Sequence, residues 1–82
     1  MSIEDPPDYA RLDAARRDLG LSVYDLWVAY IAAGGRRDAM ALRSYLTGMI
    51  DLPSVDHDEL ALALNELYAD AGGDHPLPYR RV

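Results

Sequence analysis

The chain has 82 residues, of which 50% are hydrophobic, 14 are acidic and 8 are basic, giving a formal net charge of −6. This length supports one small domain and excludes a second. The absence of cysteine excludes disulfide bonds and thiolate metal sites, and no apolar run approaches the roughly 20 residues of a membrane-spanning helix. The acidic N-terminus lacks the basic and apolar regions of a signal peptide, so we expect a cytoplasmic protein without a membrane partner.

The spacing of apolar residues and the placement of caps predict four helices and no strand. The first helix runs from about residue 8 to residue 19, between a pair of prolines and Gly20. Ser22 is a good N-cap for a second helix, which two glycines end after about residue 33. Asp38 can cap a third helix that reaches residue 47 or 48.

Ser54 or Asp56 is expected to cap the fourth helix, which runs to about residue 70, and Asp56 with Glu59 resembles a capping box. We therefore expect an all-α domain, a compact bundle of four helices over residues 8–72. Residues 1–7 are expected to be a flexible N-terminus. Residues 73–82 are expected to form an extended, Pro-rich C-terminal tail.

Helical periodicity also predicts the core of the bundle. Trp27 is expected near its centre, and seven aliphatic side chains are expected around it: Leu12, Leu26, Ile31, Leu46, Leu60, Leu64 and Leu67. The third helix should turn Leu42, Tyr45 and Met49 inward, with Met40 and Arg43 outward.

The second helix is apolar nearly all round, because Val28, Ala29 and Ala32 lie opposite its core face. A helix of this kind is normally buried on all sides, and we expect the other helices to cover it. The alternative is that Val28 and Ala32 meet a second chain, either another protein or a second copy in a homodimer. Leu62 is the odd apolar residue on the outer face of the fourth helix.

Charge is unevenly distributed along the chain. Six arginines lie between residues 11 and 43, whereas residues 51–74 carry seven acidic residues and no base. Two solvated faces of opposite sign are one interpretation. The other is a dipolar molecule that orients against a partner, through either the arginine-bearing or the acidic face.

No catalytic constellation stands out. His57 is flanked by carboxylates, but neighbours on a helix point in different directions and cannot converge on one ion, so a structural role is favoured. No nucleophile, phosphate-binding loop or metal-ligand spacing accompanies it. We expect no enzyme activity, no cofactor, no metal and no small-molecule substrate.

Two glycines precede Arg36 and Arg37, and their backbone amides could hold an anion, although a plain interhelical turn is favoured. The second and third helices could also act as a helix-turn-helix, with Arg36, Arg37 and Arg43 facing DNA. The sequence pI near 4.5 argues against nucleic acid as the partner. The tail, with two prolines before Arg80 and Arg81, could be disordered, docked or gripped by a partner.

Four segments carry a resemblance to other proteins: GLSVYDLWVAY at 20–30, the glycine pair at 34–35, YLTG at 45–48 and HDELALALNE at 57–66. Together they resemble small helical proteins of actinobacteria that have no assigned activity. The resemblance spans most of the chain and contains no motif of known chemistry. It implies an actinobacterial origin and a regulatory setting, and it transfers no functional residue.

The sequence thus predicts a non-enzymatic protein-protein interaction module, a small bacterial regulatory or adaptor protein. DNA binding through the second and third helices is the alternative. The candidate partner-binding residues are three arginines and four apolar residues: Arg36, Arg37, Met40, Arg43, Val28, Ala32 and Leu62.

Overall fold

Four α-helices make up most of the computed structural model, which describes residues 7–73 and 77–80. These helices are α1 (Asp8–Asp18), α2 (Val23–Ala32), α3 (Ala39–Leu46) and α4 (Ser54–Asp70). The described residues contain no strand, so the predicted all-α fold of four helices is confirmed. Residues 1–6 of the predicted N-terminus and residues 74–76 and 81–82 of the predicted tail lie outside the described residues. None of the four helices is long and apolar enough to cross a membrane.

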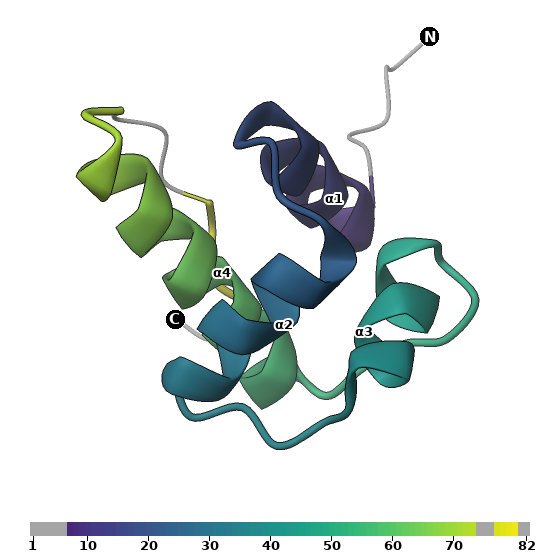
Figure 1. Cartoon of the computed structure of the whole chain (residues 1–82). Coiled ribbons are helices and arrows are strands. Elements are labelled where there is room, and N and C mark those ends of the chain that lie inside the picture. The colour runs from purple at the N-terminus through teal and green to yellow at the C-terminus, as the bar shows by residue number, and fades with distance from the viewer. Residues whose placement is uncertain (1–6, 74–76, 81–82) are drawn as a thin grey trace, which may run out of the picture.

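Each helix packs against two others around a shared centre. Helix α4 packs against α1 and α2, and α3 packs against the same two helices. In Figure 1, α3 and α4 lie on either side of α2, and α1 lies above it in this view. This arrangement buries the inner face of every helix and leaves one outer face of each in solvent.

Two of the predicted helix starts are confirmed in atomic detail. At α2 the Ser22 hydroxyl accepts from the Asp25 amide at 3.0 Å, and the Asp25 carboxylate accepts from the Ser22 amide at 3.1 Å. These reciprocal bonds form a capping box. At α3 the Asp38 carboxylate accepts from the Ala41 amide at 2.8 Å. Both caps satisfy backbone donors that the first turn of a helix leaves without intrahelical partners.

The predicted cap of α4 is wrong. The helix begins at Ser54 with Pro53 as its N-cap and without a side-chain cap. Proline suits this position because it fixes φ near the helical value. Asp56 is free for another role because Pro53 has set the start of the helix, and its carboxylate accepts from the Tyr30 hydroxyl instead.

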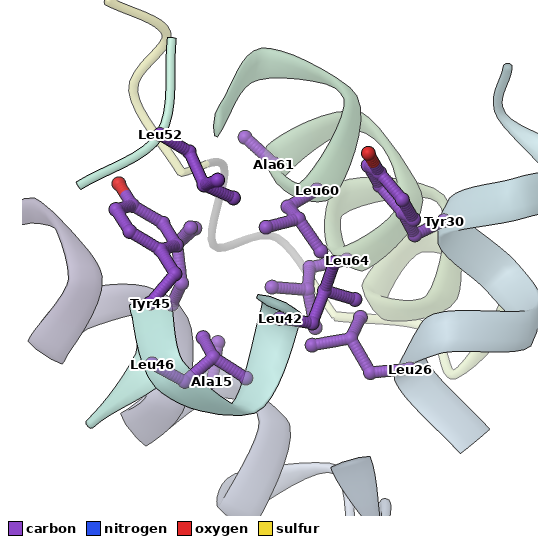
Figure 2. Packing of buried hydrophobic residues seen from close by; sticks show 11 residues of the cluster. Ala15, Leu26, Tyr30, Leu42, Tyr45, Leu46, Leu52, Leu60, Ala61 and Leu64 are labelled. Atoms are coloured by element: carbon purple, nitrogen blue, oxygen red, sulfur yellow. The ribbon is translucent and has the colours of Figure 1, made fainter. Parts of the chain in front are cut away.

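The buried core consists of aliphatic side chains and two tyrosines. Figure 2 shows Tyr30 and Tyr45 on opposite sides of a leucine cluster. Both tyrosines are almost completely buried. The predicted core positions Leu12, Leu26, Leu46, Leu60 and Leu64 are confirmed, and Ala15, Leu42, Leu52 and Ala61 complete the cluster.

Trp27 does not lie at the centre, so this prediction is wrong. Its ring is only partly buried against the core, and its indole N–H donates to the Arg37 carbonyl at 2.9 Å. A tryptophan needs an acceptor for this N–H, and the chain after α2 provides one at the edge of the bundle. The fully buried residues of α2 are Leu26 and Tyr30, which lie on either side of Trp27 along the helix.

Three other core predictions also need correction. Ile31 is exposed because it lies on the outer face of α2. Met49 is exposed because α3 ends at Leu46 and its periodicity stops there. Leu67 is only half-buried on α4.

Candidate protein-interaction surface

Helix α2 carries a stripe of large apolar side chains that the described residues leave uncovered. Tyr24 is 63% exposed, Val28 49% and Ile31 40%. Their spacing of four and three residues places them on one face of the helix. The prediction that the other helices would cover this side of α2 is therefore wrong. The four helices share a single core, and no fifth element among the described residues reaches the outer side of α2.

The stripe continues onto α3 through a shallow hollow. Tyr24 and Val23 of α2 line a space of about 320 Å³ together with Ala39, Met40 and Arg43 of α3. Met40 is 75% exposed, and the Arg43 side chain forms no ion pair with any described residue. We call the set Tyr24, Val28, Ile31, Met40 and Arg43 the α2–α3 surface.

The connection from α2 to α3 is held in place by one buried hydroxyl group. The backbone amides of Arg36 and Arg37 donate to the Tyr30 hydroxyl at 3.1 and 3.0 Å. The same hydroxyl donates to a carboxylate oxygen of Asp56 at 2.8 Å. Burial, above all, raises the pKa of Tyr30, so the hydroxyl keeps its proton at neutral pH. We call this cluster of Tyr30, Arg36, Arg37 and Asp56 the Tyr30 lock.

The Tyr30 lock removes the anion site that the glycine pair suggested. The amides of Gly34 and Gly35 donate to the carbonyls of Ile31 and Tyr30, at 3.0 and 2.9 Å. The Arg36 and Arg37 amides are also occupied, so all four amides of residues 34–37 already have acceptors within the chain. The favoured interpretation, a plain interhelical turn, agrees with the structure.

Arg36 and Arg37 face α4 across a second hollow. This hollow, of about 670 Å³, is also lined by Val55, Asp56 and Glu59. The Arg37 Nε atom lies 3.4 Å from the second carboxylate oxygen of Asp56, an ion pair too long for a good hydrogen bond. Positive and negative groups therefore balance here, whereas Arg43 stands among apolar neighbours.

The structure separates the predicted partner-binding residues into three places. Val28, Met40 and Arg43 belong to the α2–α3 surface, and the exposed Ala32 extends the same helix. Arg36 and Arg37 line the hollow toward α4. Leu62, 38% exposed on α4, lies about 200° around the helix from the buried Leu60 and Leu64, away from the core.

The acidic run of residues 51–74 does not form one solvated face. Asp56 and Asp58 are buried. Asp56 belongs to the Tyr30 lock, and the Asp58 carboxylate accepts from the Arg80 amide at 2.8 Å. Asp51 pairs with the Arg80 guanidinium at 3.2 Å. These three carboxylates have partners within the chain, so the interpretation of this run as a face that orients the molecule against a partner loses support.

His57 is the centre of a second buried polar cluster. It is 3% exposed, and its Nδ1 lies 2.6 Å from the Tyr45 hydroxyl. Burial raises the pKa of Tyr45 to about 12, so the hydroxyl is protonated and donates to a neutral imidazole. The ring also lines a small pocket together with Leu77 and Pro78. Burial and the nearby Arg80 lower the pKa of His57, and the favoured structural role agrees with this geometry.

We expect His57 to make stability depend on pH below 6.5, the ordinary pKa of histidine. The folded pKa is lower, so the unfolded chain binds more protons between the two values, and stability falls as pH drops through this window. The slope approaches about 1.4 kcal/mol per pH unit. Chemical denaturation between roughly pH 5 and 8 measures it. His57→Gln should remove the slope and His75→Gln should keep it; equal slopes in both variants would refute this assignment.

Neither polar cluster resembles a reactive centre. The described residues contain no group of three histidine, cysteine or carboxylate side chains placed to hold a metal ion. The Nδ1 atom of His57 is paired with the Tyr45 hydroxyl, and the neighbouring Asp56 and Asp58 accept from different partners. The arrangement supports folding and positioning, and the exposed chemistry lies on the α2–α3 surface.

Comparisons with known proteins add no assignment. The chain matches no family model, no curated protein and no solved structure.

Proposed function

We propose that the protein is a non-enzymatic protein-protein interaction module, a small adaptor or regulatory protein that binds its partner through the α2–α3 surface. One observation carries this proposal: the face formed by Tyr24, Val28, Ile31 and Met40 is large, apolar and exposed. Grouped apolar side chains of this size on a small protein favour an interaction site over ordinary solvent contact. Tyrosine, methionine and arginine are also residue types enriched at interfaces.

The chemistry of the surface indicates the kind of partner. An apolar stripe with a three-to-four-residue period, beside a shallow hollow, suits the apolar face of an amphipathic helix. Arg43 stands at the edge of the hollow without an ion pair to a described residue. A helix with an acidic residue at its rim would pair with Arg43. We therefore expect a different protein that presents an acidic amphipathic helix.

A second copy of the chain suits this surface less well. The acidic residue next to the stripe is Asp25, whose carboxylate already accepts from the Ser22 amide. The surface thus offers a free base without a matching free acid, and a two-fold interface must be self-complementary. DNA is also a weaker candidate. Six residues separate α2 from α3, longer than the usual turn of three or four residues, and Arg37 is paired with Asp56.

Photo-crosslinking in the native host tests the proposal. A photoreactive phenylalanine analogue at Val28 should give one dominant product with another protein, identified by mass spectrometry. The same analogue at Leu62, which is similarly exposed on α4, is the matched control and should not give that product. Equal products at both positions, or none at Val28, would contradict the proposed surface.

Binding of the purified partner then measures the contribution of the surface. Val28→Glu places a charge in the apolar stripe and should weaken binding at least about 30-fold, as expected for an interface hot spot worth about 2 kcal/mol. Leu62→Glu should bind like the wild type. Circular dichroism should show the same helicity for all three proteins. Unchanged affinity in a folded Val28→Glu protein would show that the partner binds elsewhere.

A further inference from the structure

The described residues after α4 return to the bundle and are held by specific contacts. Residues 77–80, yellow in Figure 1, run back beside α4. Asn65 brackets Leu77, because its carboxamide oxygen accepts from the Leu77 amide at 2.6 Å and its NH2 group donates to the Leu77 carbonyl at 3.2 Å. Two turns earlier on α4, Asp58 accepts from the Arg80 amide at 2.8 Å. The segment thus lies antiparallel to α4, with its backbone recognised at both ends.

The Arg80 side chain occupies a cup made by three separate parts of the fold. Its Nε donates to Asp8 of α1 at 3.0 Å. Its two terminal nitrogens donate to the Leu52 carbonyl at 2.9 Å, the Tyr45 hydroxyl at 2.9 Å and Asp51 at 3.2 Å. The guanidinium also stacks on the Tyr45 ring, 5.6 Å from its centre. Planar, multidentate recognition of this kind selects arginine over lysine.

Two apolar residues of the segment, Leu77 and Pro78, also contact the bundle. Leu77 packs against the core cluster, and Pro78 forms part of the wall of a small pocket that Leu12 and His57 also line. Leucine and arginine are therefore each held by a separate feature, and the hydroxyl of Tyr79, a residue that is 42% exposed, accepts from the Asn65 carboxamide at 3.2 Å.

No residue of this segment belongs to the buried core cluster. Every fully buried member of the core cluster belongs to the helices or to the loop before α4, and Leu77 only packs against them. A hollow of about 530 Å³ continues from Leu77 and Pro78 between α1 and α4, lined by Ala14, Asp18 and Tyr68 among others. The groove is thus longer than residues 77–80.

We propose that this groove is a peptide-binding site for an extended leucine-proline-tyrosine-arginine segment of another protein, and that Leu77–Arg80 occupies it as a built-in competitor. The site is separate from the α2–α3 surface and independent of the function proposed for it. A short tether gives the chain's own segment an effective concentration in the millimolar range. A partner segment overcomes this by extending into the neighbouring hollow.

Competition with a synthetic peptide tests the proposal. The probe is a fluorescent nonapeptide with the sequence of residues 74–82, DHPLPYRRV, added to the full-length chain. Arg80→Ala should bind the probe at least about tenfold tighter than the wild type, because its own segment has lost its main anchor. Arg17→Ala, which removes another partly paired surface arginine, should bind like the wild type. A probe with alanine in place of its first arginine should not bind.

Two outcomes would overturn the proposal. A folded Arg80→Ala protein that does not bind the probe, or that binds both probes equally, would leave the segment a structural lock. Light scattering that shows a dimer in the wild type and a monomer in Arg80→Ala would assign the groove to the tail of a second copy. If Arg80→Ala does not fold, excess probe added to the wild type must shift the NMR signals of the Asn65 carboxamide, and unshifted signals count against the site.

Discussion

Tyr30→Phe should lower the free energy of unfolding by about 3 kcal/mol, although it removes a single oxygen atom. The lost hydroxyl leaves the Arg36 and Arg37 amides without their acceptor and the Asp56 carboxylate without its closest donor. Asp56 is 4% exposed, so water cannot readily replace that donor. Each buried polar group left unpaired costs about 1–3 kcal/mol, and a charged one costs more.

Urea denaturation of the wild type and two variants measures this effect. For a domain of this size a loss of 3 kcal/mol corresponds to a fall in Tm of roughly 12–24 °C. Tyr24→Phe is the matched control, because its hydroxyl is on an exposed side chain, and it should change stability by less than about 0.5 kcal/mol. A Tyr30→Phe protein as stable as the control would show that the hydroxyl does not hold the turn.

Gly35→Ala should be about as damaging, for a steric reason. A Cβ atom at this position would lie 2.3 Å from the Cζ atom of Tyr30 and 2.4 Å from both Cε atoms. The ring cannot move aside, because it is fully buried and its hydroxyl is bonded to the two amides that follow Gly35. Overpacking of this kind costs about 1–3 kcal/mol, and we expect the upper end.

Gly20→Ala is the appropriate comparison for this variant. Gly20 has a positive φ of 73°, but a Cβ there would meet no atom within 4 Å. Its substitution therefore measures backbone strain alone, about 1–2 kcal/mol. Thermal unfolding should rank Gly35→Ala below Gly20→Ala. The reverse order would show that the turn shifts away from the ring at little cost.

The local features of the fold could be predicted from the sequence. Ser22 and Asp38 begin helices where their side chains satisfy the first backbone donors. Most of the leucines expected inside the bundle are buried, because helical periodicity follows which side of a helix faces its neighbours. These are short-range rules that use only residues close in the chain.

The exchange of Trp27 for Tyr30 at the buried position could not be predicted in the same way. Both residues lie on the inner side of α2, and size alone favours the tryptophan. The polar atoms decide the outcome. The Tyr30 hydroxyl finds Asp56, which is 26 residues away, whereas the Trp27 indole finds a carbonyl at the edge. Only the packing of α2 against α4 brings the first pair together.

The groove for Leu77–Arg80 was also beyond a local interpretation, although one signal pointed toward it. His57 shares the helical spacing of the buried Leu60, Ala61 and Leu64, which indicates a buried histidine in need of partners. The Tyr45 hydroxyl, 12 residues away, is the partner of its Nδ1 atom, and Leu77 and Pro78, 20 and 21 residues away, line a pocket with the ring. The tail could be seen to be rich in proline and arginine, but the cup around Arg80 is assembled from α1, α3 and the loop before α4.

The Tyr30 lock and the α2–α3 surface are structurally connected. The lock fixes the turn between α2 and α3, so Tyr24 and Met40 meet in one hollow on the outer side. The predicted site residues on this surface were found by their apolar character and charge. Tyr24 and Ile31 were missed as surface residues because periodicity alone favours covering an apolar helix on every side.

We propose that a single chain closes its own core as a monomer and binds a different protein through the α2–α3 surface. Light scattering of the purified chain, over roughly micromolar to millimolar concentrations, tests this claim most directly. We predict the monomer mass of 9.1 kDa at every concentration. A dimer that persists on dilution and dissociates in Val28→Glu would contradict the claim, because it would show that a second copy covers the surface.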